Sequence, residues 1–149
     1  MDWDSYFLTI AQAVALKSKD TSTKVGAIVV GPDKEIRSTG YNGFPRRVKD
    51  LPERQDSKCK LFYVAHAEAN CVYQAARVGV SLMGCSLYLS TSSVPCAECT
   101  KAIIQAGIVR VVGPDKEFPG KSAIWQESIQ RAVEMLEEAG VSIIKIKCS

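Results

Sequence analysis

Apolar residues return along the chain with two spacings, and each spacing predicts a different kind of element. Between residues 2 and 18 they recur every three or four positions, which puts them on one face of a helix. Residues 25–30 are apolar without interruption, the run stops at a Gly-Pro turn, and residues 35–41 resume an extended pattern. We therefore predict a first helix followed by a β-hairpin.

The second half of the chain alternates helical and extended patterns. We predict helices over residues 65–79, 96–106 and 122–139 and strands over residues 87–89, 108–113 and 141–147. Each of these helices ends at a glycine, which accepts the left-handed backbone of a helix C-terminus. Strand, helix and strand in succession imply parallel crossovers. The element order αββαβαβαβ thus predicts an α/β fold, a three-layer α/β/α sandwich with a five-stranded mixed sheet.

Length and charge limit the protein classes to consider. A chain of 149 residues, of which 46% are hydrophobic, suits one domain and is too short for two, so we expect a single domain over residues 1–149. The net charge of +3 is too small to indicate a nucleic-acid-binding protein, but it suits a small anionic ligand. No apolar run approaches the roughly 20 residues that span a bilayer, so we expect no membrane insertion.

Six cysteines could form a disulfide framework. The first residues of the chain, however, show neither the basic region nor the apolar segment of a secretory signal. We therefore expect a cytoplasmic protein with reduced thiols.

Two polar segments allow more than one interpretation. Residues 17–24 combine hydroxyl groups with lysines, which could hold a phosphate, and a merely solvated loop explains them equally well. Residues 46–60 are the least regular part of the chain and carry six basic side chains. We interpret them first as a solvated surface loop. Binding of an anionic nucleotide is the alternative, because long irregular loops in compact domains are often functional.

Two short motifs stand where helices are predicted to begin. The first is HAE at residues 66–68, which holds the only histidine of the chain, and the second is PCAEC at residues 95–99. Cys96 and Cys99 lie three positions apart, on one face of a helix whose positive end favours thiolates, the form that binds zinc. With His66 they provide three protein ligands and leave the fourth position open for water, as in catalytic zinc sites.

Glu68 follows the histidine by two positions, so at the first turn of the helix it can approach the same metal from another side. A carboxylate there can take a proton from a metal-bound water and pass it on. HxE followed by PCxxC is the signature of zinc nucleobase deaminases, although a CxxC pair alone can be a redox or structural motif. We therefore interpret the chain as a zinc-dependent deaminase with Glu68 as its catalytic residue and one Zn²⁺ held by His66, Cys96 and Cys99.

The chain also resembles the deoxycytidylate (dCMP) deaminases of the cytidine deaminase-like superfamily, from residue 21 to about residue 112. Besides PCAEC, the similar segments are STKVGA at 22–27, GYNGFP at 40–45, HAEAN at 66–70, and residues 84–88 and 101–108. The zinc motifs mark the superfamily, whereas GYNGFP and HAEAN point to the dCMP branch. The resemblance implies a cytidine deaminase-like fold and hydrolysis of dCMP to dUMP and ammonia in the supply of dTMP precursors, with Glu68 protonating N3 and then the departing amine.

The resemblance also implies a set of substrate contacts. The residues concerned are Thr23, Lys24, Asn42, Ala67 and Phe118. Asn42 is expected at the sugar and the backbone of Ala67 at the edge of the base. Thr23 and Lys24 are expected near the 5′-phosphate, with Lys24 as our choice for contacting it. Phe118 is expected to stack on the base. Its loop departs from the tyrosine-containing version of the family, which leaves open whether dCTP is accepted as well.

Members of this family form homohexamers that are activated by dCTP and inhibited by dTTP with Mg²⁺, at a site near the GYNGFP loop. The matching residues here are Tyr41, Asn42, Gly43, Arg46 and Arg47. Some members hold a second, structural zinc before the HAE motif. That segment offers only Cys59 and no histidine here, so we expect a single zinc per chain.

Three other functions stay open. A tRNA adenosine or polynucleotide cytidine deaminase shares the zinc motifs but needs a basic surface for an extended strand, which a net charge of +3 does not indicate. A deaminase of free nucleosides or bases would not need the lysines and arginines around the site. A non-catalytic, zinc-containing nucleotide-binding protein would have no use for Glu68. We expect small nucleotides as partners, and neither nucleic acid nor membrane.

Overall fold

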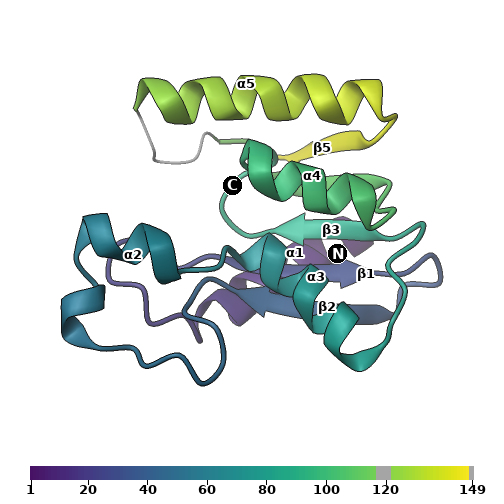
Figure 1. Ribbon diagram of the computed structural model, residues 1–149. Helices are drawn as coiled ribbons and strands as arrows, with labels where there is room; N and C mark the ends of the chain where they lie inside the picture. The colour runs from purple at the N-terminus through teal and green to yellow at the C-terminus, as the bar shows by residue number, and fades with distance from the viewer. Residues whose placement is uncertain (117–121, 148–149) are drawn as a thin grey trace.

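A mixed sheet of five strands forms the centre of the computed structural model, which describes residues 1–116 and 122–147 (Figure 1). The strands are β1 (Gly26–Val30), β2 (Ile36–Tyr41), β3 (Ser86–Leu89), β4 (Arg110–Pro114) and β5 (Ser142–Ile146). They lie in the order β2-β1-β3-β4-β5. β1 is antiparallel to β2 and β3, whereas β3, β4 and β5 run parallel. The predicted hairpin, mixed sheet and parallel crossovers are therefore confirmed.

Helices accompany the sheet on both faces. Those in the described residues are α1 (Trp3–Ala15), the 3₁₀ turn η1 (Pro52–Arg54), α2 (Ser57–Tyr63), α3 (Ala67–Val78), α4 (Ala97–Gln105) and α5 (Ala123–Glu138). α1, α3, α4 and α5 match the four predicted helices. Within the described ranges, no helix combines the length and the apolar character that crossing a bilayer requires.

η1 and α2 occupy the segment that was predicted to be irregular. Asp56 is the N-cap of α2 and accepts a hydrogen bond from the backbone N–H of Lys58 at 2.8 Å. Leu61 and Phe62 of this helix are mostly exposed, so no apolar face repeats against the core and periodicity does not reveal the helix. Figure 1 shows α2 set to one side of the sheet.

The central strands are buried on both faces because helices cover both. Ile28 of β1 shares a buried cluster with Phe7 of α1, while the neighbouring Val29 shares the other cluster with Cys71 of α3 and Leu136 of α5. This double burial explains why β1 is an unbroken apolar run rather than an alternating one. Full burial of a side chain such as Phe7 contributes roughly 1.5 to 3 kcal/mol.

A close approach at Gly40 sets the position of α3. A Cβ at this glycine would lie 2.5 Å from the carbonyl oxygen of Ala67 and 2.7 Å from the amide nitrogen of Cys71, so a side chain here would push α3 away from β2. The hydroxyl of Ser38 donates a hydrogen bond to the carbonyl of Cys71 at 2.7 Å and ties the two elements together. Because His66 immediately precedes α3, this contact also places the histidine.

Candidate active site

The two zinc motifs stand at the N-termini of neighbouring helices. His66 is the N-cap of α3 and Cys96 is the N-cap of α4, both with extended backbone angles. α4 follows β3 in a parallel crossover, so Cys96 lies beyond the carboxyl end of a central strand, where ligands of open α/β sheets bind. Packing of α3 against α4 brings together two motifs that are 30 positions apart in the chain.

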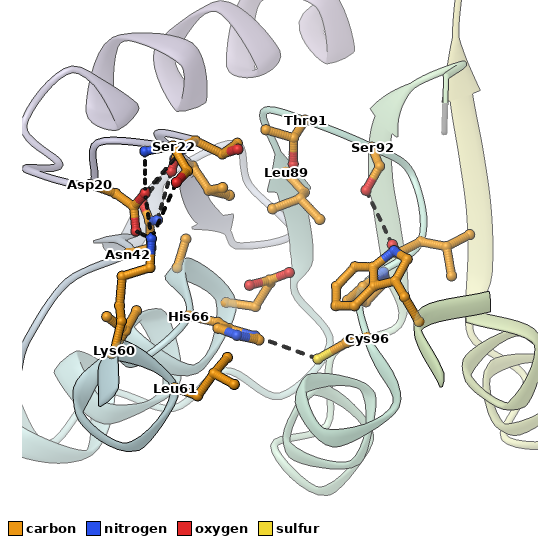
Figure 2. Close-up of a pocket in the computed structure, with 18 residues that line it drawn as sticks. Asp20, Ser22, Asn42, Lys60, Leu61, His66, Leu89, Thr91, Ser92 and Cys96 are labelled. Carbon is orange, nitrogen blue, oxygen red and sulfur yellow. Dashed lines mark hydrogen bonds and ion pairs between the residues drawn. The ribbon is translucent and has the colours of Figure 1, made fainter. Parts of the chain in front are cut away.

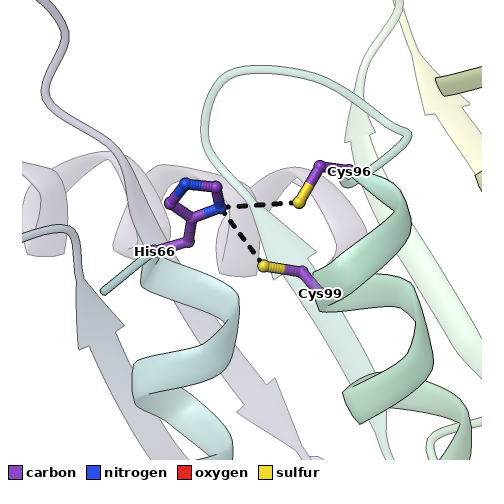
Figure 3. Close-up of side chains that lie close together, drawn as sticks. All are labelled: His66, Cys96 and Cys99. Atoms are coloured by element: carbon purple, nitrogen blue, oxygen red, sulfur yellow. Dashed lines mark hydrogen bonds between the residues drawn. The ribbon is translucent and has the colours of Figure 1, made fainter. Parts of the chain in front are cut away.

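The imidazole of His66 faces both sulfurs (Figure 3). Its Nδ1 lies 3.5 Å from Sγ of Cys96 and 3.3 Å from Sγ of Cys99, and one ligand atom from each residue falls within 4.8 Å of the other two. One nitrogen and two sulfurs at this spacing suit tetrahedral zinc with one position left open. Across the two described ranges, this is the one cluster of three or more His, Cys, Asp or Glu residues with such geometry.

Protons are shared among these side chains when no metal binds them. Hydrogen bonds with Cys99 and with His66 lower the pKa of Cys96 to about 4, and the same hydrogen bond between the thiols raises the pKa of Cys99. The hydrogen bond with Cys96 also raises the pKa of His66. A divalent cation that binds both sulfurs takes the place of the shared proton, so its binding releases that proton.

Glu68 lies in the first turn of α3 and is 6% exposed. Burial raises the pKa of its carboxyl, and the hydrogen bond from its own backbone N–H and the nearby charge of His66 oppose this rise only in part. Burial disfavours the charged carboxylate, so this carboxyl holds a proton more readily than an exposed one, which suits a group that takes up a proton and passes it on. The proposed catalytic residue thus lies beside the proposed metal ligands.

A cavity of about 260 Å³ opens in front of these residues (Figure 2). The residues singled out from the sequence that line it are Thr23, Asn42, Ala67, His66, Glu68 and Cys96. Lys24 is exposed and does not belong to the lining. Phe118 lies outside the described residues. Three of the five expected substrate contacts therefore line the same cavity as the metal ligands His66 and Cys96.

Hydrogen bonds of Asn42 stabilise the wall of this cavity. Its side-chain oxygen accepts a hydrogen bond from the backbone N–H of Val25 at 2.8 Å, and its side-chain nitrogen donates to the carbonyl of Thr23 at 2.9 Å. Its own backbone carbonyl accepts a hydrogen bond from the hydroxyl of Ser18 at 2.8 Å. Asn42 therefore holds the loop before β1 in shape as well as lining the cavity.

Some lining residues were not singled out from the sequence. They include Asp20, Ser22, Lys60 and Trp125. Composition indicated the neighbourhoods of the first three, because residues 17–24 could hold a phosphate and residues 46–60 could bind an anionic nucleotide, but it did not select these three side chains. Trp125 lies in the first turn of α5, and no local pattern relates that helix to the zinc motifs.

A second cavity, of about 670 Å³, lies between β2 and α3. Three of the five residues matched to the effector site line it, namely Tyr41, Gly43 and Arg46. Two further arginines, Arg37 and Arg77, line it as well. Asn42 lines the catalytic cavity instead, and Arg47 lines neither of the two.

The fold and the His-Cys-Cys site together are those of the cytidine deaminase-like zinc enzymes, the class that the sequence led us to expect. Comparison with models of known protein families gives the same class. Residues 1–113 match the family model described as the cytidine and deoxycytidylate deaminase zinc-binding region, and the chain belongs to this family.

Individual relatives agree with this assignment. The deoxycytidylate deaminase of Pongo abelii is 41% identical over 157 aligned positions, which cover 100% of this chain and 83% of that protein. The deoxycytidylate deaminase of Mus musculus is 41% identical over 118 positions, 75% of this chain and 64% of the relative. The crystal structure of dCMP deaminase from the cyanophage S-TIM5, in complex with dCMP and dUMP, superposes with a TM-score of 0.74 at 27% identity and 95% coverage of both chains.

Proposed function

We propose that this chain deaminates dCMP, a hydrolysis that yields dUMP and ammonia. The observation that carries the proposal is the buried carboxyl of Glu68, which lines the same cavity as the metal ligands His66 and Cys96 and as Asn42 and Thr23. Two relatives are named deoxycytidylate deaminases, and the cyanophage structure holds dCMP and dUMP, which supports the same substrate here.

We assign one Zn²⁺ to His66, Cys96 and Cys99, because the donor atoms and their spacing fit this ion. Zinc at this position supplies a Lewis acid that lowers the pKa of water to near neutrality. The protein's own part is to hold the ligands at two helix starts and to keep much of the surrounding wall apolar, with Leu89 and Val94 among the lining residues.

Glu68 is assigned the proton transfers. Its raised pKa lets the carboxylate accept a proton from the attacking water and donate it to N3 of cytosine. The carboxylate then takes the remaining proton from the hydroxyl oxygen now bonded to C4 and delivers it to the amine at C4. The bond between C4 and the amine breaks, ammonia leaves, and the oxygen of water remains on the base as the carbonyl. Each proton therefore passes through one buried carboxyl.

The remaining substrate contacts follow the resemblance to the family. We assign Asn42 to the sugar, the backbone of Ala67 to the edge of the base, and the loop of Thr23 and Lys24 to the phosphate end. Three of these residues line the cavity, which supports the arrangement. Phe118 is proposed to stack on the base, a contact that lies outside the described residues.

Regulation is proposed at the second cavity, with dCTP as activator and dTTP, together with Mg²⁺, as inhibitor. Of the residues that the family resemblance gives to the effector site, Tyr41, Gly43 and Arg46 line this cavity, whereas Asn42 lines the catalytic cavity and Arg47 lines neither. Arg77 adds positive charge to the same cavity, which suits a triphosphate, whereas Arg37 is ion-paired with Glu35 at 3.1 Å. We also propose that the chain forms a homohexamer and that the protein is located in the cytoplasm.

One experiment ranks the candidate substrates. The purified zinc-loaded protein is incubated separately with dCMP, dCTP, deoxycytidine, a short single-stranded DNA and a tRNA, and loss of the amine is followed. We expect the highest kcat/KM for dCMP, raised by added dCTP and lowered by dTTP with Mg²⁺. Activity on the polymers alone contradicts the proposal, and no turnover of any substrate indicates a non-catalytic nucleotide-binding protein.

A further inference from the structure

Lys60 places a positive charge in the wall of the catalytic cavity. It comes from the last turn of α2, and its side chain is 17% exposed. Its Nζ lies 3.2 Å from each carboxylate oxygen of Asp20 and 3.4 Å from the hydroxyl oxygen of Ser22. Both partners belong to the loop before β1, so this contact joins α2 to that loop at the cavity (Figure 2).

Asp20 is itself fixed by the backbone. Its Oδ1 accepts hydrogen bonds from the N–H groups of Ser22 at 2.8 Å and Thr23 at 3.0 Å. Burial alone would raise the pKa of Asp20, but these hydrogen bonds and the one from Lys60 outweigh burial and lower it. The carboxylate is therefore charged at neutral pH, and it holds the ammonium group of Lys60 in one place.

The distribution of charge around the cavity singles out Lys60. Among the described residues of the lining, it is the one lysine or arginine. An ammonium group has three protons, and the acceptors around Lys60 within the described part of the chain are the two carboxylate oxygens of Asp20 and the hydroxyl oxygen of Ser22. The contact with Ser22 is the longest, at 3.4 Å, and a phosphate oxygen can replace it. Lys24, the lysine expected at the phosphate from the sequence, is exposed and outside the lining. In the described lining, Lys60 is therefore the one positively charged contact for an anion that enters the cavity, and it lies beside the carboxylate of Asp20.

We propose that Lys60, oriented by Asp20, binds the 5′-phosphate of the substrate and thereby selects nucleotides over nucleosides. This inference rests on the proposed function, because it takes the base to lie at Glu68. The sugar and phosphate then extend along the cavity toward the side where Figure 2 shows Asp20, Asn42 and Lys60. A lysine recognises phosphate as a point charge, through a charge-assisted hydrogen bond.

The test is the ratio of kcat/KM for dCMP to kcat/KM for deoxycytidine. Lys60→Gln keeps a polar side chain of similar length and removes the charge, and we expect it to lower this ratio by about 30-fold or more, as loss of one partner of a buried charge pair does. Lys58→Gln, an exposed position of the same helix, is the matched control and leaves the ratio unchanged. Because the ratio compares two substrates of one variant, a partial loss of folded enzyme does not alter it.

Two outcomes overturn the inference. If Lys60→Gln lowers kcat/KM for both substrates equally, Lys60 is only a structural tie between α2 and the loop. If Lys24→Gln lowers the ratio and Lys60→Gln does not, the phosphate lies at Lys24.

A binding measurement separates this inference from the proposed function. Calorimetric titration of wild type and Lys60→Gln with dUMP and with deoxyuridine needs no turnover. We expect the variant to weaken dUMP binding by about 30-fold or more and to leave deoxyuridine binding unchanged. Wild-type protein that binds dUMP through Lys60 but deaminates nothing would refute the proposed function alone. Equal dUMP binding by both proteins would refute the role of Lys60 alone.

Discussion

Ser128, in α5, accepts a hydrogen bond at 2.8 Å from the backbone N–H of Ala97, the first residue of α4. The side chain of the N-cap residue usually accepts a hydrogen bond at a helix start, but here the N-cap is Cys96 and its sulfur faces His66. The thiol is committed to the metal cluster, so a different helix supplies the cap. α5 thus stabilises the first turn of α4, which carries Cys96 and Cys99.

This relationship predicts a stability effect. Ser128→Ala is expected to lower the free energy of unfolding by about 0.5 to 2 kcal/mol, the usual range for losing a helix cap. Urea unfolding followed by circular dichroism measures it. Ser142→Ala, at an exposed position of β5, is the control and is expected to change stability by less than about 0.5 kcal/mol. Equal effects of the two changes would contradict the capping role.

Removal of a metal ligand is expected to remove the zinc. Cys99→Ala leaves two of the three ligands, so the variant should purify without stoichiometric zinc and without deaminase activity. Metal analysis by atomic emission checks this. Cys59→Ser is the matched control, because this exposed cysteine lies outside the cluster, and it should keep both zinc and activity. Loss of zinc from Cys59→Ser would point to a second metal site.

Loss of the proton shuttle should separate metal binding from catalysis. Glu68→Gln keeps the shape of the buried side chain, so zinc content should stay at the wild-type value while kcat falls about 10²- to 10⁴-fold. Glu98→Gln serves as control because Glu98 is exposed and pairs with Lys101. A Glu68→Gln enzyme that turns over at the wild-type rate would remove Glu68 from the mechanism.

Asp4 should make stability depend on pH in the acid range. It accepts hydrogen bonds from the hydroxyl of Tyr88 at 2.6 Å and from Arg110 at 3.0 Å. Burial alone would raise the pKa of Asp4, but these two hydrogen bonds and the charge of Arg110 outweigh burial and lower it below 3.8. A carboxyl with a lower pKa in the folded state adds stability above its unfolded pKa and loses it as the pH falls through the folded pKa.

Asp4→Asn is therefore expected to destabilise the protein at pH 7, by roughly 1.5 to 3 kcal/mol. The difference from wild type should shrink as the pH falls below 3.8, the unfolded value. Urea titrations at pH 7 and at several points between about pH 4 and pH 2 measure both. Asp33→Asn, in the exposed hairpin turn, is the control, with a small effect throughout. A difference that stays constant with pH would show that Asp4 acts through packing and not through its charge.

The sequence by itself determined the fold class and the candidate chemistry, because both depend on short-range patterns. The alternation of helical and extended segments predicted the mixed sheet and its parallel crossovers. The proposed metal ligands and Glu68 belong to two motifs of a few residues each, and every one of them lies within a turn of a helix start. The spacing of residues within such a short motif does not depend on how the helices pack, so the motifs could be recognised from the sequence alone.

Only the tertiary structure decided which distant residues complete the cavity. Lys60 meets Asp20 across 40 positions, and Ser128 meets Ala97 across 31. α2, which carries Lys60, has Phe62 89% exposed and so lacks the buried apolar face that periodicity detects. Periodicity reports that one face of an element is buried, whereas the partner of a polar side chain is set by how separate elements pack. The position of Lys60 in the cavity wall therefore follows only from the packing of α2 against the loop before β1.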